Sequence, residues 1–146
     1  MNTITAADLG IEVVGENGLY RWLVASFLMG KRIRASIAVH AYQKVVDQHG
    51  LDTPAKLAGC HHSTLVRILG EAGYARYDLS TARRLKALAG ALNTQLGHQL
   101  RDLHERTQDL EGFTRWLLNF EGVGPKTIEI FMREASTELN YLCQGS

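Results

Sequence analysis

The sequence predicts an all-α fold, a compact bundle of about six or seven helices in one domain that spans residues 1–146. Apolar residues recur at helical spacing along most of the chain, and no segment alternates with period two for long enough to indicate a strand. There are only two prolines and we find no internal repeat, so nothing marks a domain boundary. A chain of 146 residues is long enough to bury a core.

The first helices are delimited by glycines. Leu19–Met29 is apolar nearly all round, which is typical of a central buried helix, and Gly30 interrupts it. The next helix is expected over about Ile33–His49, ended by Gly50. Its apolar residues fall at helical spacing, at Ile33, Ile37, Ala41 and Val45.

Start signals place the middle helices. Thr53 is a good N-cap before Pro54, so we expect a short helix that ends near Ala58. Another is expected over about Ser63–Glu71. Ser80 is expected to cap a long amphipathic helix. The buried stripe of that helix should be Leu85, Leu88, Ala89, Leu92 and Leu96.

The last third of the chain predicts three helical pieces. Two are expected between Gln99 and Phe120, and Pro125 should open the final helix. The predicted core stripe of the final helix is Ile128, Phe131, Met132, Ala135, Leu139 and Leu142.

Composition excludes several function classes. The formal net charge is +1, so any basic surface must be local. Cys60 and Cys143 cannot hold an iron–sulfur cluster, match no zinc spacing, and are interpreted as thiols of a reducing compartment. Met1–Gly10 has no signal-peptide pattern, and Leu19–Met29 is too short to span a bilayer. We therefore expect a soluble, cytoplasmic protein with no membrane partner.

The segment with the most chemical content is residues 119–127, which lies between two predicted helices. Gly122 and Gly124 permit positive φ and the close approach of another backbone, and Pro125 pre-sets the first helical φ. Amides at the positive start of a helix bind anions, a phosphate above all. The amides expected to point outward are those of Val123, Gly124, Lys126 and Thr127.

Other glycine-loop interpretations disagree with the spacing. A P-loop has glycine directly before its lysine, where this chain has Pro125. The dinucleotide fingerprint needs a third glycine at Thr127 and a strand before the loop. An ordinary glycine turn between two core helices remains as the alternative to a DNA-binding hairpin.

The run from Phe120 to Thr127 resembles the hairpin of the helix-hairpin-helix DNA glycosylase superfamily, to which endonuclease III belongs. The run 23–28 followed by Lys31 is similar to the buried second helix and following loop of that family. The run 73–77, followed by 80–82, resembles the segment after its fourth helix. The resemblance covers roughly Leu19 to Glu134, the six-helix part of the family.

This resemblance implies roles for individual residues. Gly122 and Gly124 match the glycines whose amides hold a phosphate, and Lys126 matches the Schiff-base lysine of the glycosylase/lyase members. Lys31 falls where a wedge residue fills the gap left by a flipped nucleotide, and 74–77 falls near a second wedge. The carbonyls that match those coordinating a monovalent cation in relatives are Leu118, Phe120 and Val123.

The chain also departs from the family pattern. By spacing, the catalytic aspartate, which follows the last helix of the hairpin and a further loop, would fall near Gln144, which is not acidic. No aspartate occurs after Asp109. Breaking a glycosidic bond builds positive charge on the sugar that a carboxylate would stabilise. Glu129 lies one turn from Lys126 and could pair with it.

Lys126 therefore has two candidate roles, a phosphate contact and a catalytic nucleophile. It lies opposite the predicted core stripe of its helix, so it should face a surface or a cleft. Burial and the positive helix start would both favour the neutral amine that a Schiff base needs. A partner subunit or a second copy in a homodimer could complete the half-cleft and supply the missing acid.

Further basic residues are candidates for DNA contact. Lys31, Arg32 and Arg34 follow the buried helix on a loop and could contact phosphates, although a solvated loop is the alternative. Arg76, with Tyr74 and Tyr77, could stack on exposed bases, although such aromatics are more often packing residues. Arg83, Arg84 and Lys86 are interpreted as a solvated helix face.

Three functions remain open at this point: a repair protein of the glycosylase/abasic-site lyase type that acts on duplex DNA, a non-catalytic DNA-binding module of the same fold, and a helical protein-interaction domain. No organic cofactor is expected.

Overall fold

The computed structural model describes residues 3–144, which form seven α-helices and no strand, so the predicted all-α bundle is confirmed. The α-helices are α1 (Gly15–Met29), α2 (Ala35–Tyr42), α3 (Pro54–Ala58), α4 (His62–Ala72), α5 (Asp78–His104), α6 (Leu110–Leu118) and α7 (Pro125–Gln144). Three shorter segments accompany them: the 3-10 turns η1 (Ala7–Leu9) and η3 (Ala75–Tyr77), and the π-helical η2 (Gln43–Gln48).

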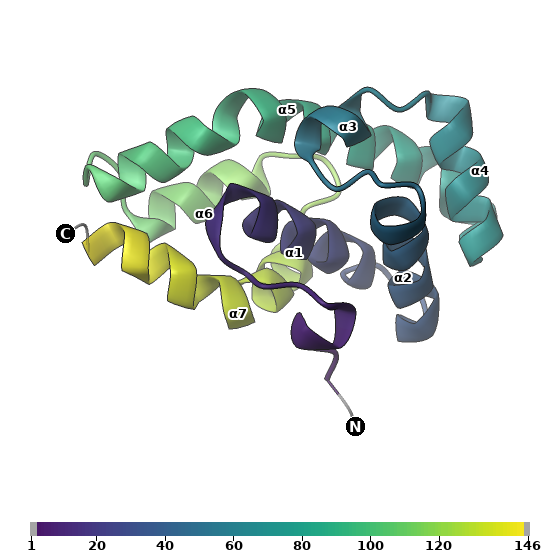
Figure 1. Ribbon diagram of the computed structural model, residues 1–146, viewed down its shortest axis with the longest axis horizontal. Coiled ribbons are helices and arrows are strands. Elements are labelled where there is room, and N and C mark those ends of the chain that lie inside the picture. Colours follow the sequence, from purple (N-terminus) through teal and green to yellow (C-terminus); the bar gives the residue numbers. More distant parts are fainter. Residues whose placement is uncertain (1–2, 145–146) are drawn as a thin grey trace.

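Helix α1 lies at the centre of the bundle, between α5 on one side and α7 on the other (Figure 1). Every residue from Gly18 to Leu28 except Arg21 is buried, as the nearly continuous apolar sequence predicts. The buried Trp22 indole N–H donates a hydrogen bond to the Phe131 carbonyl at 3.0 Å. Because a buried indole N–H needs an acceptor, this bond helps to hold α7 beside the central helix.

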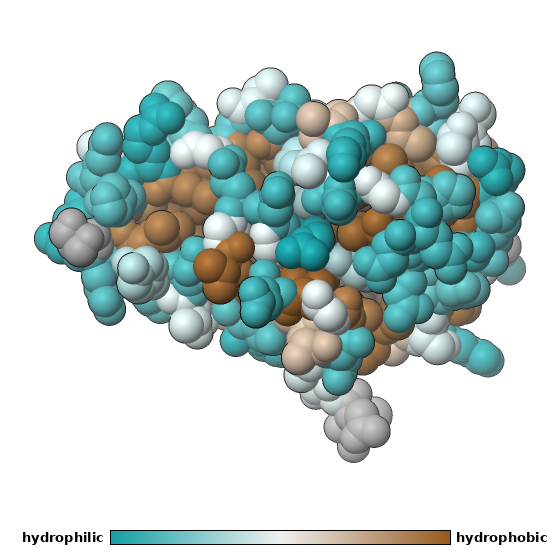
Figure 2. Space-filling model, viewed as in Figure 1, coloured by the Kyte–Doolittle hydropathy of each residue, from teal (hydrophilic) through white to brown (hydrophobic). Residues whose placement is uncertain are grey.

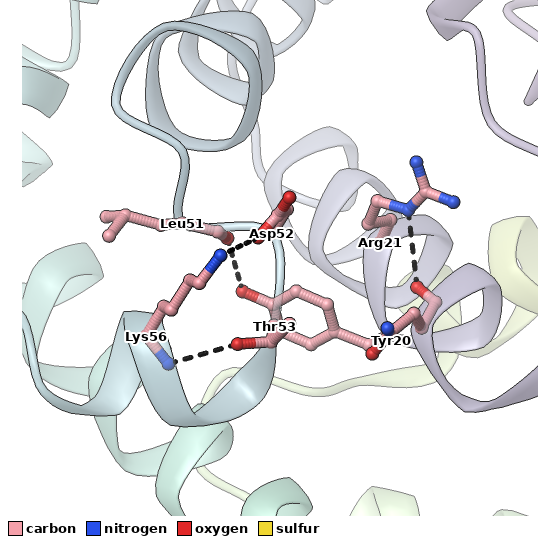
Figure 3. A network of polar contacts seen from close by, with 7 residues as sticks. Tyr20, Arg21, Leu51, Asp52, Thr53 and Lys56 are labelled. Carbon is pink, nitrogen blue, oxygen red and sulfur yellow. Dashed lines mark hydrogen bonds and ion pairs between the residues drawn. The ribbon is translucent and has the colours of Figure 1, made fainter.

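A polar network connects α1 to the start of α3 (Figure 3). The Thr53 hydroxyl accepts a hydrogen bond from the Lys56 amide at 3.3 Å, which confirms the predicted N-cap. The Tyr20 hydroxyl donates to the Leu51 carbonyl at 2.9 Å, and burial raises the pKa of Tyr20. The Lys56 ammonium pairs with Asp52 at 3.0 Å on the surface. The network fixes the loop that leads into α3.

Two predicted boundaries around α5 are wrong. The helix begins at Asp78, so Ser80 lies inside its first turn instead of capping it. The helix continues to His104, so the first of the two pieces expected between Gln99 and Phe120 is the end of α5. Neither Gly90 nor Gly97 breaks the helix, since each interior glycine costs only about 1 kcal/mol. The predicted stripe Leu85, Leu88, Ala89, Leu92 and Leu96 is buried.

The surface drawn in Figure 2 is mainly hydrophilic, with its broadest apolar area towards the end that carries the C-terminus. The core beneath it contains large side chains of α1 packed with the apolar faces of α2, α5 and α7, and α4 packs against α5. Among the residues that the structure describes, no helix combines the length and apolarity needed to cross a membrane.

Candidate nucleic-acid interface

The connection between α6 and α7 is a tight turn, and we call residues 119–127, which include the first residues of α7, the hairpin. The Val123 amide donates to the Phe120 carbonyl at 3.0 Å and closes the turn. Gly122 is the third of the four residues of this turn and has φ +89°, a left-handed value that glycine adopts without strain. Of the two glycines that permit a positive φ, only Gly122 adopts one, and Gly124 does not. Gly124 directly precedes α7, and its carbonyl accepts the Ile128 amide at 3.1 Å as the helix begins.

The hairpin is packed against the end of α1. A Cβ on Gly122 would lie 2.8 Å from Cε2 of Phe27, closer than real contacts allow. A Cβ on Gly30 would collide with the hydroxyl oxygen of Thr127. Val123 is buried and anchors the turn in the core. The two glycines therefore let the hairpin backbone approach α1, which fixes where the start of α7 lies.

Lys31 joins the loop after α1 to the hairpin. Its ammonium donates a hydrogen bond to the Gly122 carbonyl at 2.7 Å and lies 4.3 Å from the centre of the Phe27 ring. Partial burial, together with the nearby Arg84 guanidinium, lowers the pKa of Lys31. An ammonium has three donors, so two remain for other acceptors. The wedge assignment did not anticipate this contact with the hairpin.

An open hollow of about 380 Å³ lies beside the start of α7, lined by Gly30, Lys31 and residues 122–127. Within residues 3–144, the amides of Gly124, Lys126 and Thr127 have no hydrogen-bond acceptor. The Val123 amide, expected to be free, is instead used to close the turn. Free amides at the positive end of a helix attract an anion, and this hollow gives one access to them.

Lys126 lies on the rim of this hollow with an exposed side chain. Its ammonium is 3.9 Å from a carboxylate oxygen of Glu129, so the predicted pairing is confirmed. Glu129 also accepts a hydrogen bond from Arg133 at 3.2 Å. Both Lys126 and Glu129 are 60% exposed, and an ion pair of this kind contributes at most about 1 kcal/mol. The burial expected around an activated lysine is absent.

Two arginines of α5 reach the hairpin, a contact that the sequence did not predict. Arg83 donates to Glu121 at 2.7 Å, and this hydrogen bond lowers the pKa of Glu121. The Nε atom of Arg84 is 3.5 Å from Glu121, is buried, and makes no hydrogen bond. Arg84 lies four residues before Leu88, a member of the buried stripe, and residues with this spacing share one face of a helix. The position of Arg84 at the edge of the core could therefore have been predicted from the sequence.

The other predicted basic residues are less close to the hairpin. Arg32 is exposed and lines a second hollow, together with Lys31 and Arg84. Arg34 directly precedes α2, is exposed, and lines neither hollow. Arg76 lies on η3, is also exposed, and lines neither hollow. The structure therefore groups Lys31, Arg32 and Arg84 around the second hollow and leaves Arg34 and Arg76 outside this group.

The two tyrosines after α4 differ in exposure. Tyr74 is buried, and its hydroxyl donates to the Leu28 carbonyl at 3.2 Å. Burial raises the pKa of Tyr74. Tyr74 is therefore a packing residue, which is the role that the sequence favoured, and it offers no exposed ring for stacking on a base. Tyr77 is 56% exposed and keeps a free aromatic surface.

The three carbonyls assigned to a monovalent cation lie along the hairpin. The Phe120 carbonyl accepts the Val123 amide, and within residues 3–144 the carbonyls of Leu118 and Val123 have no backbone donor. An all-oxygen set of this kind suits a hard cation. Across the same described range, no three His, Cys, Asp or Glu side chains gather into a group that could hold a metal ion.

Gln144 lies at the far end of α7 from the hairpin. Residues 125–144 form one continuous helix, so the loop expected before position 144 is absent. With 1.5 Å of rise per residue, Gln144 is about 27 Å along the helix axis from Lys126. A side chain at this position cannot act on the same sugar as Lys126, whatever its chemistry.

No family model, curated protein or solved structure matches this chain. The resemblance to helix-hairpin-helix glycosylases therefore depends on the hairpin, on the run 23–28 of α1 with Lys31 after it, and on the run that follows α4.

Proposed function

We propose that this chain is a DNA-binding protein of the base-excision-repair type, resembling a DNA glycosylase or abasic-site lyase, and that it holds a backbone phosphate of duplex DNA beside the hairpin. The observation that carries the proposal is the open hollow next to three unused amides, lined by two lysines and no carboxylate. A cytoplasmic location belongs to the same proposal.

The binding chemistry follows from the lining of the hollow. A phosphate oxygen placed there would accept hydrogen bonds from the amides of Gly124 and Lys126. The ammonium of Lys31 has two donors left after its bond to the hairpin, and Lys126 adds a second positive charge. A monovalent cation on the carbonyls of Leu118, Phe120 and Val123 would add charge close by. These contacts read no base, so this part of the binding should be independent of sequence.

Salt dependence tests the phosphate contact. The affinity for a duplex should fall with salt on a log–log plot with a slope of about −0.9 per phosphate contact. Lys126→Ala should reduce that slope by about 1. Lys56→Ala is the matched control, because Lys56 is also exposed but lies on α3 and lines neither hollow. Equal slopes for the two variants would remove the hairpin from the binding site and favour the protein-interaction alternative.

Lys126 is the candidate nucleophile. In the lyase reaction, its amine lone pair would add to the C1′ aldehyde of an abasic sugar, and loss of water would leave an imine between Lys126 and the sugar. Borohydride reduces such an imine to a stable amine and traps the protein on DNA. The wild type should form this adduct and Lys126→Ala should not.

A non-catalytic DNA-binding module is the second candidate, and a specific observation favours it. The side chain of Lys126 is 60% exposed and its ammonium lies 3.9 Å from Glu129, so the burial expected around a Schiff-base lysine is absent. If the wild type binds duplex DNA with the expected slope but gives no trapped adduct on abasic DNA, the chain alone is not a lyase. Repeating the borohydride trap over a series of protein concentrations tests whether a homodimer completes the site. Adding a partner subunit tests whether a different protein supplies the missing acid.

A further inference from the structure

A second hollow lies beside the hairpin, between the loop that follows α1 and the start of α5. It has a volume of about 250 Å³, and Lys31 lines both this hollow and the one at the start of α7. Its walls include Ile33, Tyr74 and Tyr77. The proposed function makes no use of this second hollow.

The lining combines aromatic rings with cations. Three of its residues carry positive charge, namely Lys31, Arg32 and Arg84, and none carries negative charge. Tyr74 is held rigidly by burial, whereas Tyr77 keeps more than half of its surface exposed. A ligand that fits this lining has a flat apolar ring and an anionic group.

The cations are only partly neutralised by the protein. The positive charges of Lys31 and Arg84 are close enough that Arg84 contributes to lowering the pKa of Lys31. The buried Nε of Arg84 makes no hydrogen bond, and its nearest acid, Glu121, is 3.5 Å away and also binds Arg83. An anion bound between Lys31 and Arg84 would relieve the repulsion between these two positive charges.

The volume limits the ligand to one ring system. Pockets for drug-sized molecules usually measure about 300–1,000 Å³, so a hollow of about 250 Å³ has room for one flat ring group with its anionic group at the rim. A base within a duplex is stacked on both faces and paired along its edge, so it could not enter. If the ring is a nucleobase, it must therefore be free of such stacking and pairing.

We propose that this hollow binds one nucleotide unit, with its base against the exposed ring of Tyr77 and its phosphate between Lys31 and Arg84. The unit comes either from a free mononucleotide or from an unpaired position of a DNA strand, and the chemistry of the contact is the same. Binding of a free mononucleotide does not require phosphate binding at the hairpin. Binding of a DNA nucleotide rests on the proposed function, and the substrate of that function is then DNA with an unpaired nucleotide.

Isothermal titration with three small probes tests the binding chemistry. Adenosine 5′-monophosphate should bind about tenfold or more tightly than adenosine, which lacks the phosphate, and than inorganic phosphate, which lacks the ring. Amide chemical shifts of 80 and 81 should move with the nucleotide, while those of 124 and 126 move less. Equal affinity for inorganic phosphate and for the nucleotide would reduce the hollow to an anion site and overturn the proposal. The proposal would also be overturned if none of the three probes binds and the protein does not prefer a duplex with an unpaired nucleotide.

Two variants, each with a matched control, locate the site. Ser80→Trp places bulk in the hollow and should weaken nucleotide binding about tenfold, whereas Leu79→Trp, at a 63% exposed neighbour outside the lining, should not. Arg32→Gln removes a cation at an exposed position and should also weaken binding. Arg101→Gln makes the same charge change about 25 Å further along α5 than Arg84 and should have no effect. Unchanged affinity in both Ser80→Trp and Arg32→Gln would place the ligand elsewhere.

Duplexes with and without one unpaired nucleotide distinguish the sources. Tighter binding of the duplex with the unpaired position, lost in Ser80→Trp, assigns the hollow to DNA; equal binding of both duplexes, with mononucleotide binding retained, assigns it to free nucleotide. Failure of the hairpin proposal would appear separately, as equal salt slopes for Lys126→Ala and Lys56→Ala.

Discussion

Replacing Gly122 with alanine should destabilise the fold far more than the same change at Gly124, two residues away. Gly122 has φ +89°, whereas Gly124 has no positive φ. A Cβ at Gly122 would meet the Phe27 ring, but a Cβ at Gly124 would meet no heavy atom within 4 Å. The two substitutions add the same methyl group to one hairpin, so they isolate what the turn geometry and the packing against α1 require.

The magnitude for Gly122→Ala has two parts. A left-handed backbone costs a residue with a side chain about 1–2 kcal/mol. The new Cβ would lie 2.8 Å from Cε2 of Phe27, which is fully buried and cannot move aside freely. Overpacking of this kind typically costs about 1–3 kcal/mol. The free energy of unfolding should therefore fall by about 2–5 kcal/mol, a large share of the 5–15 kcal/mol typical of a domain.

Gly124→Ala should leave the stability within about 1 kcal/mol of the wild type. Alanine restricts the unfolded chain more than glycine does, which raises the free energy of unfolding by about 0.4–1 kcal/mol. The loss of glycine, a better N-cap residue than alanine, offsets part of this gain. The added methyl group would nevertheless stand beside the unused amides. We therefore expect Gly124→Ala to weaken duplex binding without unfolding the protein, because glycine permits the closest approach of a phosphate.

Urea denaturation followed by tryptophan fluorescence measures both variants, and thermal melts should show a fall of roughly 5–15 °C for Gly122→Ala. The m-values of both variants should match that of the wild type, which would show that unfolding exposes the same surface and that only the free energy of unfolding has changed. If Gly122→Ala unfolds within about 0.5 kcal/mol of the wild type, or if the two variants lose equal stability, then neither the positive φ nor the contact with Phe27 constrains position 122.

Two further predictions concern charges at the hairpin. The pKa of Lys31 is lowered from 10.5 in the folded protein, so between that lowered value and 10.5 the unfolded chain binds more protons and stability rises with pH. Wild type should therefore gain stability relative to Lys31→Met as the pH is raised through this window, as measured by urea unfolding; a constant difference would contradict it. Glu121→Gln should raise the affinity for duplex DNA, because the Arg83 bond lowers the pKa of Glu121 and keeps its carboxylate charged beside the hairpin. Fluorescence anisotropy at fixed salt measures this affinity, and equal affinities would remove Glu121 and the α5 arginines from the binding surface.

The parts of the fold that the sequence predicted are those that depend on local periodicity. The buried stripe of α5 follows from apolar side chains that return to one face every 3.6 residues. The centre of the α7 stripe, Phe131, Ala135 and Leu139, is buried as predicted, while Ile128 lies only at the edge of the core. The beginning of α5 could not be predicted because Asp78 and Ser80 are both acceptable near a helix start, and only tertiary packing decides between them.

The parts that the sequence did not predict are contacts between distant segments. The ammonium of Lys31 binds a carbonyl 91 residues away, and no local pattern specifies such a partner. The use of the Val123 amide inside the turn could have been foreseen, because Gly122 as third residue favours a turn closed by the fourth. The interpretation of Arg84 as part of a solvated face rests on its charge. The position of Arg84 next to the buried stripe is the better guide, since its Nε atom is buried.

The positions of the acids on α7 limit what chemistry this chain can perform alone. The Glu134 carboxylate accepts the Ala6 amide at 2.7 Å, and that of Glu138 accepts the Gly15 amide at 2.8 Å, so both hold the N-terminal segment. Glu129 is therefore the one acid of α7 within the described residues that lies beside Lys126, and it is exposed and shared with Arg133. Stabilising an oxocarbenium-like sugar calls for a carboxylate shielded from water, where its charge acts strongly. Base excision by this chain would need an acid from another protein, whereas the proposed imine between Lys126 and an abasic sugar would need no such carboxylate, because its formation breaks no glycosidic bond.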